Sequence, residues 1–207
     1  MTPTRSRRKH VSVSAITEKL ADYMAAARSV RLPAAVAEKT KHHVLDTIAA
    51  MMSGAALPPG RIALSYGRTL GGVREASVFG CRHLSNAINA ALVNGMLAHA
   101  DETDDSHAAS LTHPGCGVVP AALAVAERER AGGTALLSAV ALGYDVCARI
   151  TMALDPYEFL RDGHSTHGFG PMFGAAAAAA SLLRLDARQM RHVLSFTAQQ
   201  AAGVSCW

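Results

Sequence analysis

Apolar residues recur every three to four positions along most of the chain, which is the spacing of helices with one buried face. This spacing, broken by proline and glycine, predicts helices over residues 17–28, 33–54, 61–70, 84–105, 116–130, 134–152, 174–185 and 187–203. Residues 71–81 are expected to form a loop with at most one short extended piece. The sequence therefore predicts an all-α fold, a globular bundle of about eight helices.

Two of these segments are unusually rich in small residues. Residues 84–105 contain many alanines and asparagines, and residues 175–180 are six consecutive alanines. Small side chains let helices approach closely, so both segments are expected inside the bundle. The apolar stretches 115–126 and 170–183 are shorter than the ~18 residues needed to cross a bilayer, and no membrane association is expected.

The charge of the chain is concentrated at its N-terminus. The net charge of +4 equals the contribution of Arg5, Arg7, Arg8 and Lys9 alone, so the remaining residues are neutral overall. No basic stripe is available to follow a phosphate backbone, and nucleic acid is not an expected partner. We expect residues 1–12 to form a disordered basic tail and residues 13–207 to form one helical domain.

Cysteine usage and the N-terminal sequence both favour a cytoplasmic protein. The four cysteines are scattered without a C-x-x-C pair, which argues against a zinc knuckle or a redox motif. The residues after the basic tail lack the ~7–15-residue apolar region of a secretory signal. A reduced protein of the cytoplasm is the expectation.

Four acidic residues and three histidines lie within one short stretch, between two apolar segments. They are His99, Asp101, Glu102, Asp104, Asp105, His107 and His113. A nearby acid raises the pKa of an imidazole and burial lowers it, and the balance can keep a histidine near neutrality for proton transfer. We expect His113, held by the turn at Pro114, to act as general base or acid, oriented by Asp101, Glu102 or Asp105. The alternative is a solvated helix end.

A second polar segment, residues 163–170, precedes the alanine-rich helix. Its glycines allow close backbone approach, and the N–H groups at the start of the next helix can bind an anion such as a carboxylate. His164 and His167 are therefore candidate site residues. A loop with only local hydrogen bonds is the alternative.

Other chemistries find less support in the sequence. The H-x-D and D-D-x-H spacings are compatible with zinc, iron or manganese, so a metal-dependent hydrolase stays open as an alternative. No H-E-x-x-H motif, serine elbow or dinucleotide-binding glycine pattern occurs. We expect neither a metal nor a cofactor.

In combination, several of these segments resemble the MmgE/PrpD family, over nearly the whole chain. They are SNAINAALVNGMLAHADETDDSH, HPGCGVVPAALAVAE, GYDVCARI, GHSTHGFGPMFGAAAAAASLLRLD and TAQQAAGV. The family includes 2-methylcitrate dehydratase, cis-aconitate decarboxylase and iminodisuccinate epimerase. The resemblance implies a lyase or isomerase that removes a proton beside a carboxylate of a small polycarboxylate, ending in dehydration, decarboxylation or epimerisation.

The resemblance also implies site residues. A family motif similar to H-x-L-D-[FY]-D-D-[ST]-H places its leading aspartate on Glu102 and leaves Asp101 where an apolar residue is expected, so either can be the active-site carboxylate. The HPG motif places the catalytic histidine on His113. A second motif, similar to F-H-P-T-x-T-x-G-P-F-G, falls on His164, with one additional residue near positions 171–173 that leaves His167 as the alternative.

Asp104, His107 and His167 are then expected to bind substrate. The resemblance further implies a homodimer and a second, α+β domain that this chain lacks. No lysine occurs between Lys41 and Trp207, so the cations for substrate carboxylates are expected from that domain, and the isolated chain is expected to be inactive. A non-catalytic, truncated helical dimerisation module is the rival interpretation.

Overall fold

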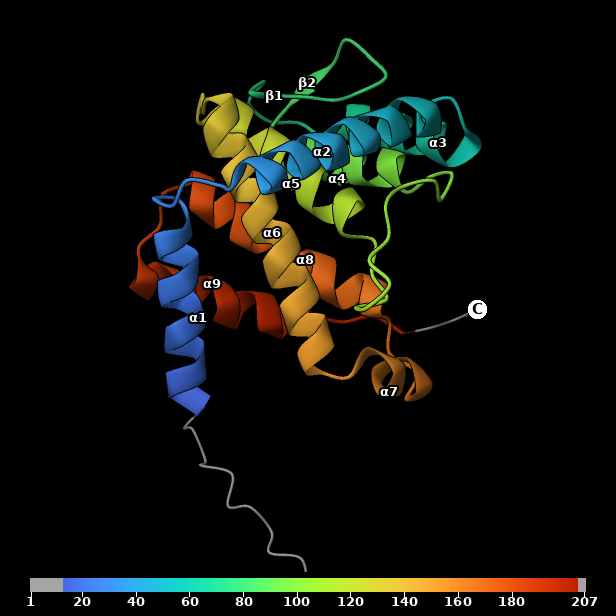
Figure 1. Cartoon of the computed structure of the whole chain (residues 1–207). Helices are drawn as coiled ribbons and strands as arrows, with labels where there is room; N and C mark the ends of the chain where they lie inside the picture. The colour runs from blue at the N-terminus through green and yellow to red at the C-terminus, as the bar shows by residue number, and fades with distance from the viewer. Residues whose placement is uncertain (1–12, 205–207) are drawn as a thin grey trace, which may run out of the picture.

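The computed structural model describes residues 13–204, and the predicted basic tail at residues 1–12 lies outside this range. The described residues form helices and one small hairpin (Figure 1). The helices are α1 (Val13–Ala27), α2 (Ala34–Gly54), α3 (Pro58–Thr69), α4 (Ala87–Ala98), α5 (Pro114–Arg128), α6 (Gly133–Ala153), α7 (Pro156–Arg161), α8 (Thr166–Leu182) and α9 (Ala187–Gln200). The all-α prediction is confirmed. The short helix α7, which begins at a proline and is capped by Asp155, was not predicted.

The centre of the bundle is the packing of α6 against α8, with α5 beside both (Figure 1). The two helices approach so closely that a Cβ atom on Gly174 would lie 2.6 Å from the carbonyl oxygen of Gly143. In the alanine-rich helix, Ala177 and Ala178 have no exposed surface. The prediction that the alanine-rich segment lies inside the bundle is therefore confirmed.

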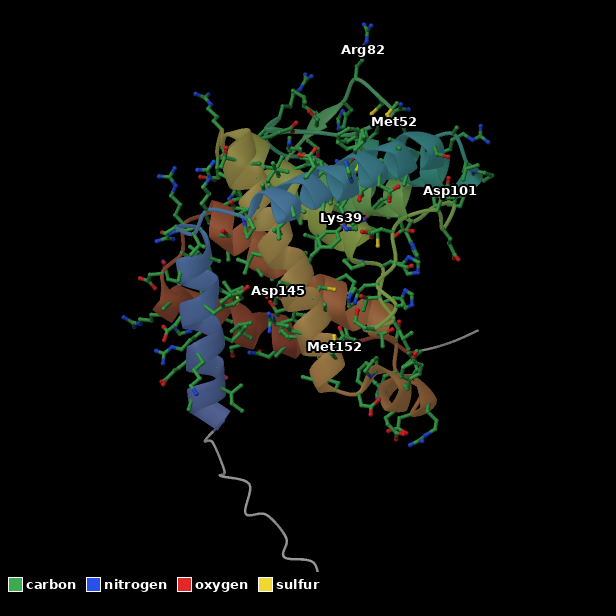
Figure 2. The ribbon with its side chains drawn as sticks, in the orientation of Figure 1. Lys39, Met52, Arg82, Asp101, Asp145 and Met152 are labelled. Atoms are coloured by element: carbon green, nitrogen blue, oxygen red, sulfur yellow. The ribbon has the colours of Figure 1, made fainter. Side chains whose placement is uncertain are left out.

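The remaining helices cover this centre. Helix α2 lies across α4 and α5 on one side, whereas α1 packs against α9 on the other (Figure 1). Arg82, at the hairpin tip, projects outward from the ribbon (Figure 2). The last described residues return to the start of α8, where the backbone N–H of Ser165 donates to the carbonyl of Gly203 at 3.1 Å.

The predicted helix over residues 84–105 is wrong at both ends. Leu84–Ser85 is strand β2, which pairs antiparallel with β1 (Ala76–Ser77). Asn86 then caps α4 by accepting a hydrogen bond from the N–H of Asn89 at 2.9 Å, and the helix ends at Ala98. Residues 99–113 form a loop, because their polar side chains bond to neighbouring helices and to one another instead of continuing the helix.

The predicted loop over residues 163–170 is also partly wrong. Helix α8 begins at Thr166, capped by the hydroxyl of Ser165, so the glycine-rich stretch forms its first turns. A Cβ atom on Gly170 would lie 2.2 Å from the hydroxyl oxygen of Thr151, so glycine allows α8 to pack tightly on α6. As a result, His167 belongs to a helix while His164 does not.

One helix of the described part, α6, is long and apolar enough to cross a membrane on length and composition alone. Its residues Val140, Val146 and Cys147 are fully buried in the bundle, as in the core helix of a globular fold. Cys81, Cys116 and Cys147 are free thiols, and Cys206 lies outside the described range.

Candidate active site

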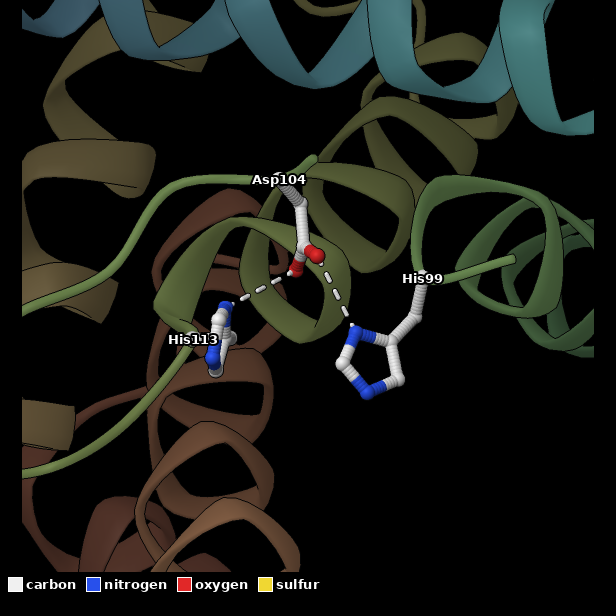
Figure 3. Close-up of side chains that lie close together, drawn as sticks. All are labelled: His99, Asp104 and His113. Carbon is white, nitrogen blue, oxygen red and sulfur yellow. Dashed lines mark hydrogen bonds and ion pairs between the residues drawn. The ribbon is translucent and has the colours of Figure 1, made fainter. Parts of the chain in front are cut away.

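The loop between α4 and α5 directs one carboxylate into the protein and two imidazoles onto it. The side chain of Asp104 has no exposed surface. Its Oδ1 atom lies 3.0 Å from Nδ1 of His99, and its Oδ2 atom lies 3.7 Å from Nδ1 of His113 (Figure 3). The predicted proximity of His113 to a carboxylate is confirmed.

Helix ends hold both imidazoles. His99 is the residue directly after α4, and His113 directly precedes α5, whose first residue is Pro114. Proline is favourable at the first helical position because its fixed φ suits the helix. Since α4 and α5 pack against each other, the end of one and the start of the other bring His99 and His113 to within 5.5 Å between ring centroids.

Asp104 and His99 each stabilise the charged form of the other. The hydrogen bond that His99 donates to Asp104 raises the pKa of His99 above its ordinary value, although partial burial opposes this. Burial disfavours the charged form of Asp104, yet the hydrogen bond and charge of His99 hold the pKa of this carboxyl below its ordinary value. Asp104 is therefore a buried anion stabilised by imidazole.

The outward-facing nitrogens are the ones available for chemistry. In both rings Nδ1 faces Asp104, so Nε2 points away from the carboxylate (Figure 3). The His99 and His113 side chains are 41% and 23% exposed, so reactants can reach them. An imidazole oriented by a buried carboxylate through one nitrogen can exchange a proton through the other.

A third imidazole enters from α8. The ring centroid of His167, in the first turn of that helix, lies 4.7 Å from that of His113. Burial and the charges of His113 and His99 lower the pKa of His167. The Thr166 hydroxyl also donates to the Leu111 carbonyl, which ties the start of α8 to the loop. The N-termini of α5 and α8 thus meet at the imidazoles, and helix N-termini favour anions.

Several predicted residues lie elsewhere. Asp101 accepts hydrogen bonds from Ser53 at 2.6 Å and from Thr103 at 2.8 Å near the surface. Glu102 is exposed, with a left-handed φ of 53°. The structure therefore contradicts the prediction that Asp101, Glu102 or Asp105 pairs with His113: the paired acid is Asp104, whose Oδ2 lies 3.7 Å from Nδ1 of His113.

Two of the predicted site histidines, His107 and His164, contact residues close to them in the sequence. His107 is exposed and its Nδ1 lies 2.8 Å from the hydroxyl of Ser110. His164 is exposed and stacks on Phe159 with ring centroids 4.8 Å apart. Neither joins the group formed by His99, Asp104, His113 and His167, called the histidine cluster below.

Asp105 bonds on the opposite side of the loop, to residues that the sequence did not single out. Its Oδ2 atom lies 2.8 Å from Nδ1 of His43 and accepts from the hydroxyl of Tyr144 at 2.7 Å. His43 lies on α2, far from the motif in sequence, and no local pattern connects it to Asp105. His99 was visible as the first residue of the polar stretch but was not assigned a role.

Comparison with known proteins identifies the family. The family model for the MmgE/PrpD N-terminal domain matches residues 18–207. The chain belongs to the MmgE/PrpD family. A cis-aconitate decarboxylase-like protein of Aspergillus oryzae is 29% identical over 200 residues, which make up 91% of this chain and 41% of that protein.

Two further relatives of this MmgE/PrpD chain have similar coverage. The human cis-aconitate decarboxylase is 28% identical over 196 residues, or 91% of this chain and 40% of the human protein. That of Aspergillus terreus is 25% identical over 199 residues, or 92% of this chain and 40% of the fungal protein. The chain spans about 40% of the length of these curated relatives.

The histidine cluster also has the donor set of a metal site. His99, Asp104 and His113 each offer one ligand atom, and these atoms lie within 4.8 Å of one another. Two histidines and a carboxylate suit divalent transition metals. A cation bound there would compete with protons for Nδ1 of His99 and His113, so the metal and acid–base interpretations give opposite expectations for chelation.

Proposed function

We propose that this MmgE/PrpD chain supplies the acid–base groups of a lyase that acts on a small polycarboxylate. Decarboxylation of a tricarboxylate like cis-aconitate is the first candidate reaction, because the curated relatives are named for it. The observation that carries the proposal is buried Asp104 between His99 and His113, which leaves Nε2 of each imidazole directed away from the carboxylate.

The proposed reaction needs one group that transfers a proton to or from a carbon atom of the substrate. Loss of carbon dioxide leaves an electron pair that is delocalised into a neighbouring unsaturated carboxylate, and protonation at carbon completes the reaction. His113 in its protonated form would donate from Nε2, while Asp104 stabilises the imidazolium. Run in the other direction, the same group removes a proton beside a carboxylate, as dehydration or epimerisation requires.

The substrate's negative charge needs its own binding groups. The starts of α5 and α8 provide N–H groups and the positive ends of two helix dipoles. No lysine follows Lys41 in the sequence, and every described ion pair of Asp104 is with a histidine. We infer that further cations come from polypeptide beyond this chain, either another domain or the second subunit of a homodimer.

An assay on the purified chain tests the proposal. The chain is incubated with cis-aconitate or 2-methylcitrate in deuterated water, alone and mixed with a separately expressed C-terminal domain of a cis-aconitate decarboxylase. Histidine side-chain resonances report binding. We expect both acids to shift the His113 and His167 resonances, and turnover with deuterium incorporation only in the mixture.

Each result has a clear meaning. Robust turnover by the chain alone would show that the site is complete here and that the inference about missing cations is wrong. No turnover in any mixture and no histidine shift with either acid would overturn the proposed function.

A non-catalytic helical dimerisation module is the second candidate function. In that case the chain would self-associate in sedimentation experiments but leave its histidine resonances unchanged on addition of either acid.

A further inference from the structure

Asp105 joins three helices through one carboxylate. Its Oδ2 atom lies 2.8 Å from Nδ1 of His43 on α2 and 2.7 Å from the hydroxyl oxygen of Tyr144 on α6. Its Oδ1 atom accepts a hydrogen bond of 2.8 Å from the backbone N–H of Gly115, in the first turn of α5. We call these residues, Asp105, His43, Tyr144 and Gly115, the Asp105 anchor.

Gly115 is required by this arrangement. A Cβ atom at position 115 would lie 2.6 Å from Oδ1 of Asp105, 2.7 Å from the Thr47 hydroxyl and 3.0 Å from the Tyr144 hydroxyl. The glycine lets the start of α5 approach the carboxylate closely enough for its N–H group to bond. Because His113 lies two residues before Gly115, this bond also restricts the position of the His113 backbone.

The neighbouring aspartate shares the same piece of backbone. Asp104 and Asp105 are consecutive, yet the first bonds to the histidine cluster and the second to α2, α5 and α6. Holding Asp105 therefore limits how far Asp104 can move relative to His99 and His113. The Oδ2 atom of Asp104 and Nδ1 of His113 are both buried and have no hydrogen-bond partner, so their separation depends on backbone placement.

We propose that His43, Tyr144 and Asp105 are positioning residues that hold Asp104 and His113 in the geometry needed for proton transfer. The inference rests on the proposed function and assigns these three residues no contact with substrate. Burial and the charge of Asp105 raise the pKa of Tyr144 well above its ordinary value, so the phenol remains a hydrogen-bond donor.

Tyr144→Phe is the decisive variant because it removes one oxygen and no formal charge. Its matched control is Tyr23→Phe, which deletes a similar hydrogen bond of 2.8 Å to Asp145, the next residue along α6. The titration of His99 is followed by side-chain nuclear magnetic resonance in the whole chain. The charged groups that face His99 are Asp104, Glu102 and His113, and neither variant alters them.

We expect Tyr144→Phe to lower the titration midpoint of His99 toward its ordinary value of 6.5, because the bond to Asp104 lengthens. Tyr23→Phe should leave it unchanged. In the mixture that turns over, Tyr144→Phe should lower kcat by about tenfold to a hundredfold with KM nearly unchanged, the effect of misplacing a reacting group by about 1 Å.

An unchanged His99 titration in Tyr144→Phe, with or without a lower melting temperature, would show that the anchor only stabilises the fold and would overturn the inference. If Tyr144→Phe fails to fold, Gly115→Ala breaks the same contacts from the other side and is judged by the same titration. If no polycarboxylate turns over and neither acid shifts the histidine resonances, the proposed function fails, while the titration still decides the positioning role.

Discussion

The two polar segments of this chain are both rich in histidine, but they contribute different numbers of residues to the histidine cluster. The loop over residues 99–113 brings a buried carboxylate and two imidazoles together, whereas residues 163–170 contribute only His167. The histidines that meet lie at helix ends or in a first turn: His99 follows α4, His113 precedes α5 and His167 lies in the first turn of α8. His107 and His164 lie in the connections, where His107 contacts Ser110 and His164 stacks on Phe159. Helix ends, more than local density of polar residues, select the site.

The strongest test of this difference compares His113→Ala with His164→Ala. In the mixture that turns over, loss of the proposed acid–base group should lower turnover at least about a hundredfold, the lower end of such contributions. His164→Ala should stay within about twofold of wild type, because His164 is exposed and substitutions of exposed residues are usually nearly neutral.

Initial rates with cis-aconitate and 2-methylcitrate provide the measurement. Wild-type activity in His113→Ala would remove this histidine from the mechanism. A large loss in His164→Ala, with the variant folded, would instead show that the second segment contributes the residue that the family motif first indicated.

Within residues 99–113, substitution of two different aspartates should change the free energy of unfolding by different amounts. Asp104→Ala removes the buried partner of two imidazoles and should lower the free energy of unfolding by about 1–3 kcal/mol. Asp101→Ala, at the surface, should change it by about 0.5 kcal/mol or less. Urea unfolding of both variants measures the difference, and equal losses would contradict the distinction between an inward and an outward carboxylate.

The pH dependence of stability sharpens the same comparison. The pKa of His99 is raised above 6.5, so its contribution is fully present below pH 6.5 and is lost as pH rises through its value in the folded protein. The pKa of Asp104 is lowered below 3.8, so its contribution is present above pH 3.8 and is lost as pH falls through its folded value. The pair therefore stabilises most between these two limits.

The measurement is the difference in unfolding free energy between wild type and Asp104→Asn across this pH range. His167 acts separately, because its lowered pKa makes protonation unfavourable in the folded state and costs stability as pH falls. A difference that does not depend on pH would contradict the claim that Asp104 and His99 stabilise each other's charged forms.

Helical periodicity was sufficient to predict the fold class, because buried faces dominate α5, α6 and α8. The element ends were less predictable. The polar stretch after Ala98 has helix-compatible residues, and its loop conformation depends on partners such as Ser53 and His43 that come from other helices. In the same way, glycines 168 and 170 suggested a loop, but both lie in α8, where Gly170 packs closely on α6 and Gly168 on residues 202 and 203.

The candidate site was only partly predictable for the same reason. The motifs point to His113 and His167, and the polar stretch contains Asp104, the carboxylate beside His113. Which aspartate faces the histidine cluster depends on three-dimensional contacts: Asp104 meets two imidazoles, while Asp105 meets His43 and Tyr144. No spacing within the stretch distinguishes these two neighbours.

The smallest expected effect is that of removing metal. His99, Asp104 and His113 place three ligand atoms within 4.8 Å, as many protein ligands as catalytic zinc sites use. Yet Nδ1 of His99 already lies 3.0 Å from Oδ1 of Asp104, at hydrogen-bond distance, and a cation would have to replace the proton there and enter beside a carboxylate with no exposed surface. We therefore expect chelator treatment to leave the melting temperature and the rate of the reacting mixture unchanged.

Elemental analysis of the purified chain provides the direct check, with His99→Gln as the matched variant. Stoichiometric zinc, iron or manganese that is lost in His99→Gln would show that the first segment is a metal centre, and the role of His113 as a proton carrier would then be wrong.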